Sequence, residues 1–197
     1  MIVMPTFTTR RFTLRPLTVK DAEDVHAFAS LDEVGPRAGW KPHRTLRETK
    51  SYIQQTMGRI KHGRPGVYAL VLNETMNVIG TIEIHSYVED YKGELGMVLH
   101  PDYWSQGLME EASRVMMVYA FEILSLMRLS YKHFSNNFAS KRLREKLGFT
   151  YEGIKRKSYK RFDGRILDEV VASFTDEDYT RHKEAFDAFK ETFEVSL

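Results

Sequence analysis

The pattern of apolar and polar positions along the chain predicts strands and helices in alternation. Apolar runs and period-two alternation predict strands at residues 11–17, 67–72, 78–87, 94–100, 128–134, 150–160 and 165–174. Apolar residues at three- and four-residue spacing predict helices at residues 18–31, 45–61, 108–124, 137–147 and 176–193. No internal repeat or linker-like stretch interrupts this order. We therefore expect a single α+β domain over residues 1–197.

The stretch 103–124 is the most informative part of this pattern. Pro101 and Asp102 end the apolar strand before it, a loop with the small residues Ser105 and Gly107 follows, and a helix begins at once. A strand, a small-residue loop and a helix in this order direct free backbone N–H groups and the positive end of a helix dipole toward an anion. An ordinary turn explains the same residues equally well. The stretch contains neither GxGxxG nor GK[ST], which argues against a dinucleotide-binding fold and excludes a P-loop.

Composition narrows the classes of function. The chain has 197 residues, a formal net charge of +2 and no cysteine. The small net charge gives no indication of nucleic-acid binding, and the lack of cysteine excludes a disulfide scaffold, a thiolate metal site and a catalytic cysteine. The seven histidines show no metal-ligand spacing, so no metal is expected. Because the sequence shows no signal peptide and no membrane-length apolar run, it predicts a cytoplasmic protein without a membrane partner.

A second informative stretch follows the strand predicted at 128–134. Asn137 is a favourable N-cap for a short helix that Gly148 ends, and Ser140 lies in the first turn of that helix. From the residues alone, a capping role for Asn137 and Ser140 is the simpler interpretation.

Two motifs at matching separation resemble the GNAT N-acetyltransferases. Residues 104–112, WSQGLMEEA, resemble the acetyl-CoA pyrophosphate loop of that family, most closely in the RimJ/RimL-like branch of ribosomal-protein N-terminal acetyltransferases. Ser105 and Met109 stand where that loop commonly has Gly and a small residue. Residues 137–149 resemble the family's Asn-x-x-Ser motif and the Gly-Phe that follows it, with the spacing kept. With the opening strand and a late Gly…Asp pattern, the resemblance covers most of residues 10–176.

The resemblance implies a fold, an activity and a set of binding residues. The fold is a single GNAT-like domain with a mixed, mostly antiparallel sheet, a central splayed strand and flanking helices. Its core covers about residues 10–176, and a C-terminal helical extension covers 177–197. The activity is acetyl-CoA-dependent N-acetyl transfer by direct attack of a primary amine, either a protein N-terminus or a small amine. The residues implied in acetyl-CoA binding are Met97, Val98, Leu99, Ser105, Gln106, Gly107, Leu108, Met109, Asn137 and Ser140.

The catalytic residues follow less directly from the resemblance. Many GNAT enzymes carry a Tyr seven residues after the motif Asn, where it protonates the CoA thiolate, but this chain has Arg144 there. The branch with Ser at the fourth position uses that hydroxyl instead, which makes Ser140 the candidate acid. For the general base we rank Glu83 first, His85 second and Glu94 third. The two carboxylates would approach the thioester, and the imidazole shares a strand face with Glu83. Deprotonation relayed by water fits equally well.

Two further questions stay open in the sequence. The alternative to catalysis is a module that binds CoA or nucleic acid, the latter through the basic and aromatic hairpin at 155–162. Strand alternation argues against that surface, because it would send the hairpin side chains to opposite faces. The aromatic side of the helix predicted at 176–193, with Phe186, Phe189 and Phe193, is expected to pack on its own domain or on a second subunit of a homodimer.

Overall fold

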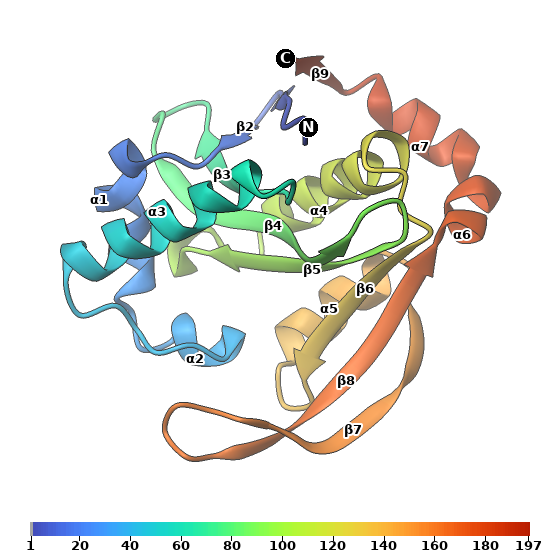
Figure 1. The fold of residues 1–197 in the computed structure, drawn as a ribbon. Coiled ribbons are helices and arrows are strands. Elements are labelled where there is room, and N and C mark those ends of the chain that lie inside the picture. The colour runs from blue at the N-terminus through green and yellow to red at the C-terminus, as the bar shows by residue number, and fades with distance from the viewer. Residues whose placement is uncertain (1) are drawn as a thin grey trace.

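The computed structural model describes residues 2–197, and these residues form one open nine-stranded sheet (Figure 1). The strand order is β7-β8-β6-β5-β4-β3-β2-β1-β9. The strands are β1 (Thr6–Thr9), β2 (Phe12–Pro16), β3 (Val67–Leu72), β4 (Val78–Val88), β5 (Lys92–Leu99), β6 (Arg128–Phe134), β7 (Thr150–Lys160), β8 (Ile166–Thr175) and β9 (Phe193–Ser196). All neighbouring strands are antiparallel except β5 and β6, which are parallel. The mixed, mostly antiparallel sheet is therefore confirmed.

Helices cover both faces of this sheet (Figure 1). They are α1 (Ala22–Ala29), α2 (Gly35–Ala38), α3 (Leu46–Lys61), α4 (Leu108–Val118), α5 (Phe138–Lys146), α6 (Asp176–Arg181) and α7 (Lys183–Lys190), with short helical turns at Val19–Asp21, Pro101–Tyr103 and Tyr119–Ile123. One apolar core joins α1 and α3 to the sheet, and a larger core joins α4, α6 and α7 to the opposite face. The sheet is thus the middle layer of three, and its central strands are covered on both sides.

Strand β3 shows why the centre of the sheet is apolar throughout. Val67 and Val71 belong to the core with α1 and α3, whereas Tyr68 and Leu70 belong to the core with α4. Successive side chains of a strand point to opposite faces, so a strand covered on both faces needs apolar residues at every position. The uninterrupted run VYALVL is the sequence signal of this double burial.

Most predicted elements are present, with differences at their ends. The first predicted strand is β2, which ends at Pro16, and the structure adds β1, which we did not predict. Helix α2 lies inside the stretch expected to be a loop, and the helix expected to reach residue 31 ends at Ala29. The strands β3 to β8 and the helices α3 and α5 follow their predicted ranges closely.

Helix α3 buries a different stripe of residues from the one expected. The helical spacing of Tyr52, Ile53, Met57 and Ile60 predicts that these side chains face the core. Met57 is instead 39% exposed, whereas Thr49 is fully buried. The Thr49 hydroxyl lies 2.9 Å from His26 Nδ1 and 3.0 Å from His43 Nδ1. Because a buried hydroxyl with hydrogen-bond partners costs little, a polar residue can occupy an inward position that an apolar pattern does not reveal.

The C-terminal segment is not the single helix that the sequence predicted. The helix is interrupted at His182, which separates α6 from α7. Strand β9 then pairs with β1, with Phe193 opposite Thr9. Phe186 and Phe193 are buried in the core of the same chain, and Phe189 packs against it. Of the two packings expected for this aromatic side, packing on its own domain is the one observed.

Strands β5 and β6 separate soon after they meet. Their parallel pairing ends at Glu94 and Ser130, although both strands continue beyond these residues. On their outer sides, β5 stays paired with β4 and β6 stays paired with β8. We call the resulting gap, between residues 95–99 of β5 and residues 131–134 of β6, the fork. The splayed central strand is therefore present.

The loop between β5 and α4 turns through two residues in the left-handed backbone region. Ser105 has a φ of 61° and Gly107 a φ of 74°. Glycine adopts this conformation freely, whereas a residue with a side chain incurs a steric penalty. The tight turn into α4 therefore uses Gly107 for its conformational freedom and holds Ser105 under strain.

Phe186→Ala should lower the free energy of unfolding by about 3–5 kcal/mol, because it removes a buried ring and leaves a cavity. Phe138→Ala is the matched control, since Phe138 is 67% exposed. That control should change the free energy of unfolding by less than about 0.5 kcal/mol. Urea denaturation followed by circular dichroism measures both variants. Equal losses would contradict the placement of α7 in the core.

Candidate active site

The turn into α4 presents a row of free backbone donors. Within residues 2–197, the amide N–H groups of residues 105–110 have no hydrogen-bond acceptor, and the first bond of the helix runs from Glu111 N to Gly107 O at 3.1 Å. Consecutive unpaired N–H groups at a helix N-terminus carry partial positive charge and bind anions. The predicted residues Ser105, Gln106, Gly107, Leu108 and Met109 therefore lie together in a backbone site suited to a phosphate group.

Side chains hold this loop in place. Trp104 Nε1 donates to Leu99 O at 2.8 Å, which fixes the loop to the end of β5. Arg11 Nη1 donates to Gln106 O at 2.9 Å, and Arg11 Nε donates to Glu111 at 2.8 Å. Arg11 neutralises a carboxylate beside the free amides and supports the loop backbone. No pattern along the chain indicates this contact, because Arg11 and Glu111 are far apart in the sequence.

Asn137 and Ser140 meet at the start of α5. Asn137 Oδ1 accepts a hydrogen bond from Ser140 N at 3.1 Å, which is the N-cap expected from the residues alone. The Ser140 hydroxyl makes a second contact that capping does not require. Its Oγ lies 2.8 Å from the hydroxyl of Tyr131, the first residue of β6 beyond the paired part of β5 and β6. Ser140 is therefore tied to the fork as well as to its own helix.

Tyr131 is a site residue that the sequence analysis missed. It is 1% exposed, and its hydroxyl also lies 3.9 Å from Met97 Sδ on the other side of the fork. Burial raises the pKa of Tyr131 to about 12, against the opposing effects of the Ser140 hydrogen bond and the positive charge of Arg144. The phenol is therefore protonated at neutral pH. In a strand of mixed apolar and polar residues, nothing distinguishes this Tyr from an ordinary core residue.

The three candidate bases lie on the face of the sheet opposite α4. In the register of β4 and β5, Glu83 stands opposite Gly96 and His85 opposite Glu94, so all four share a face. His85 Nε2 lies 3.8 Å from Glu94 Oε1. A Cβ on Gly96 would lie 2.9 Å from His85 Cδ2 and 3.3 Å from Glu83 Cγ. The missing side chain at Gly96 thus makes room for the two candidates on β4.

Both carboxylates of this cluster have cationic partners. Glu83 pairs with Arg59 of α3, and Glu94 pairs with Lys132 of β6. His85 has a hydroxyl at Nδ1, from Ser86 at 3.0 Å, and Glu94 near Nε2. The cluster therefore offers an imidazole between polar neighbours and two carboxylates engaged by cations.

Arg144 takes the place of the usual Tyr without taking its role. Its side chain is buried, its Nη2 donates to Glu145 at 3.0 Å, and its guanidinium lies 5.6 Å from the ring centroid of Tyr151. Arginine cannot give up a proton at physiological pH. Arg144 contributes a fixed positive charge near Tyr131 and is not suited to donate a proton.

The segment around α2 contacts both the loop before α4 and the loop before α5. Arg37 lies over the ring of Trp104 at 4.7 Å, and its carbonyl accepts from Asn137 Nδ2 at 3.4 Å. In the β7–β8 hairpin, Tyr159 donates to Gly39 O at 2.9 Å and Arg161 donates to Pro36 O at 3.2 Å. An aromatic and a basic residue of the hairpin are thus used in packing against α2. This weakens the argument for the hairpin as a nucleic-acid surface.

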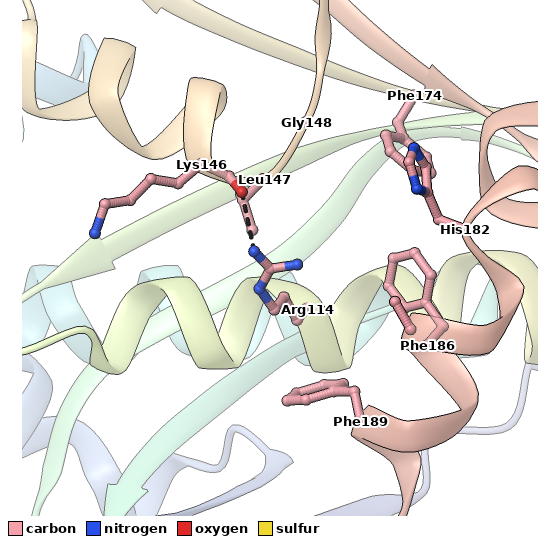
Figure 2. Close-up of a pocket in the computed structure, with 9 residues that line it drawn as sticks. Arg114, Lys146, Leu147, Gly148, Phe174, His182, Phe186 and Phe189 are labelled. Carbon is pink, nitrogen blue, oxygen red and sulfur yellow. Dashed lines mark hydrogen bonds between the residues drawn. The ribbon is translucent and has the colours of Figure 1, made fainter.

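A small cavity on the α4 side contains none of the predicted site residues. Figure 2 shows Arg114 of α4 donating to the carbonyl of Lys146, near the rings of Phe174, Phe186 and Phe189. The cavity measures about 200 Å³ and lies between α4, the end of α5 and α7. The Arg114 guanidinium is already bonded to Lys146 O and paired with Glu110, so we interpret the cavity as an imperfectly filled boundary between elements.

Two absences bear on the chemistry. In the described part of the chain, no three His, Asp or Glu side chains cluster in a way that could hold a metal ion. None of the helices formed by residues 2–197 has the length and apolar character needed to cross a membrane.

Comparison with known proteins gives consistent results. The family described as "Acetyltransferase (GNAT) domain" matches residues 11–150. The uncharacterized N-acetyltransferase YoaA of Bacillus subtilis is 31% identical over 155 residues, covering 78% of this chain and 88% of YoaA. The uncharacterized N-acetyltransferase p20 of Bacillus licheniformis is 28% identical over 177 residues, covering 89% of this chain and 99% of p20.

Solved structures show the same fold. A GNAT-family acetyltransferase from Bacillus anthracis superposes with a TM-score of 0.77 at 24% identity, covering 87% of this chain and 99% of the other. A ribosomal-protein-S5-alanine acetyltransferase from Vibrio fischeri superposes with a TM-score of 0.76 at 21% identity, covering 88% and 98%. With the family match over more than half of its length, this chain belongs to the GNAT acetyltransferase family and is an acyltransferase.

Proposed function

We propose that the protein transfers the acetyl group of acetyl-CoA to a primary amine by direct attack. The observation that carries this proposal is the arrangement about the fork. The free amides before α4 and the Tyr131–Ser140 pair lie on the α4 side, and the cluster of Glu83, His85 and Glu94 lies on the opposite face. A donor on one face and an amine on the other can therefore meet at the gap between β5 and β6.

The residues present fit acetyl-CoA as the donor. The N–H groups of residues 105–110 suit its diphosphate, and the unpaired edge of β5 at Met97, Val98 and Leu99 suits the amides of its pantetheine arm. Leu99 O already accepts a hydrogen bond from Trp104 Nε1, so the donors and acceptors of that edge that are available to a ligand belong to the residues before Leu99 O. Asn137 supports the site indirectly in this proposal, because its side chain fixes the first turn that holds Ser140.

Bound acetyl-CoA supplies the acetyl group as a thioester, whose C–S bond breaks as the N–C bond to the amine forms, with the electron pair left on sulfur. Ser140 gives its hydroxyl proton to that sulfur and recovers one from solvent. The base on the opposite face accepts the proton that the amine nitrogen loses. The fork backbone donates hydrogen bonds to the acetyl oxygen as negative charge develops there.

His85 is the base that the geometry favours, in place of Glu83, which we ranked first from the sequence. Arg59 pairs with Glu83 and Lys132 pairs with Glu94, so a substrate amine would have to compete with a cationic partner for either carboxylate. His85 is a neutral acceptor when unprotonated, and Glu94 at 3.8 Å stabilises the imidazolium that forms. Glu94 then acts beside His85 as a stabilising charge.

The proposed function is tested by titration with CoA and by an amine panel. The protein should bind CoA and release free thiol from acetyl-CoA with at least one of N-terminal peptides, polyamines or aminoglycosides. Gly107→Val should weaken CoA binding at least tenfold, because a side chain there obstructs the approach of a diphosphate to the amides. Gly164→Val is the matched control, since Gly164 has a similar φ of 82° at a hairpin tip. Absence of CoA binding would refute the function, and binding without acetylation of any amine would favour the non-catalytic alternative.

Ser140→Ala should lower kcat on the order of 10²-fold, the low end for a general acid, with little change in CoA affinity. If Ser140 only belonged to the first turn of α5, the same change would cost a modest amount of stability and leave turnover intact. Steady-state kinetics and a melting curve on the one variant separate these outcomes.

His85→Asn should lower kcat/KM by about 10²–10⁴-fold, as expected for loss of a general base. Glu83→Gln, which breaks only the pair with Arg59, should have the smaller effect. A larger loss in Glu83→Gln than in His85→Asn would return the role of base to Glu83.

A further inference from the structure

The hydroxyl of Tyr131 lies where β5 and β6 begin to separate. The paired part of β6 ends at Ser130, so Tyr131 is the first residue whose strand neighbour on β5 is missing. From there its hydroxyl reaches Ser140 Oγ of α5 at 2.8 Å and lies 3.9 Å from Met97 Sδ of β5. The Tyr131 hydroxyl therefore links β6 to α5 and to β5 where the gap begins.

The direction of the Tyr131–Ser140 hydrogen bond depends on what fills the fork. Each hydroxyl has one proton, and either oxygen can donate across the 2.8 Å contact, while Ser140 O at 3.3 Å is a second, more distant acceptor for the Tyr131 proton. Once the Ser140 proton points at an acceptor in the fork, Ser140 Oγ can only accept from Tyr131. Because burial keeps the phenol protonated at neutral pH, Tyr131 is always able to donate. Hydrogen bonds in such a chain strengthen one another.

We infer that Tyr131 is a positioning residue, which donates to Ser140 Oγ and thereby aims the Ser140 hydroxyl at the sulfur of CoA. This inference rests on the proposed function and adds a residue to its site. Tyr131 does not touch the substrate and gives up no proton. It fixes the orientation of Ser140 and makes that hydroxyl a stronger donor, which is needed because Arg144 stands at the position of the usual acid.

Neighbouring aromatic side chains fix the position of the Tyr131 ring. Phe149 packs edge-on at a ring-centroid distance of 5.3 Å, and His133 lies at 6.3 Å on the same strand face. Burial lowers the pKa of His133, and the charged group that acts on the pKa of Tyr131 is Arg144. The hydrogen bonds run from Tyr131 to Ser140 and from Ser140 to the sulfur of CoA. The positive charge of Arg144 favours the development of negative charge on that sulfur. Tyr131→Phe leaves these packing contacts in place and removes one oxygen.

The test measures the thiol of bound CoA, which requires no acceptor amine. The probe is CoA at saturating concentration, and the readout is the ultraviolet absorbance of its thiolate as a function of pH. A hydrogen bond to the thiolate lowers the thiol pKa, so the value for CoA bound to the wild type should be lower than that of free CoA by about 1. Tyr131→Phe should return at least half of this difference, and Ser140→Ala should return all of it.

The double variant decides whether Tyr131 acts through Ser140. If it does, Tyr131→Phe made in the Ser140→Ala background changes the thiol pKa no further, and it also leaves kcat unchanged, whereas alone it lowers kcat about tenfold. Tyr179→Phe is the control, because it removes another buried hydroxyl, bonded to Glu122, away from the fork. That variant should leave the thiol pKa of bound CoA as in the wild type.

The outcomes separate this inference from the function on which it rests. CoA affinity is measured on every variant by calorimetry, and loss of CoA binding in the wild type would overturn the function and the inference together. CoA binding with the same thiol pKa in the wild type and in Tyr131→Phe would overturn the inference alone. A melting curve confirms that Tyr131→Phe is folded, and Ser140→Ala gives a second, independent measurement if that variant is unstable.

Discussion

The end of pairing between β5 and β6 is the constraint on which the rest of the structure depends. Each strand keeps its outer neighbour along its length, but the two share hydrogen bonds only as far as Glu94 and Ser130. The right-handed twist of a sheet lets two well-paired halves diverge once the contact between them is lost. The backbone groups beyond that point need partners other than a strand. Everything proposed for this site lies at this interruption or is directed toward it.

The fork also divides the site chemically. Alternation along β4 and β5 sends apolar side chains to the α4 face and the polar cluster to the other. Ion pairing gives Glu83 the partner Arg59 and Glu94 the partner Lys132, so neither carboxylate is left as an unpartnered charge in a partly covered position. On the α4 side, neutral hydroxyls and backbone N–H groups face the gap. Groups suited to accept a proton and groups suited to stabilise negative charge are thereby kept on separate faces.

The fold could be predicted largely from the sequence because its signals are local. Period-two and helical spacing, Asn137 as a cap and the small-residue turn at Gly107 each act within a few residues. The site could be predicted only as far as its motifs. The roles of Arg11 and Tyr131 depend on partners from other elements, and no pattern along the chain marks such pairs. Strand β9 was missed for the same reason, because it forms by pairing with β1 at the other end of the chain.

The unpaired edges of β5 and β6 link the strength of the fold to its chemical surroundings. A ligand that lies along the fork supplies the contacts that a tenth strand would supply, and it binds only the folded chain. Its binding energy then adds to the free energy of unfolding as the logarithm of its concentration, about 2.7 kcal/mol at a hundred times the dissociation constant. The melting temperature of this protein in a cell would thus follow the supply of its donor. A shortage would loosen the two halves of the sheet at the joint between them.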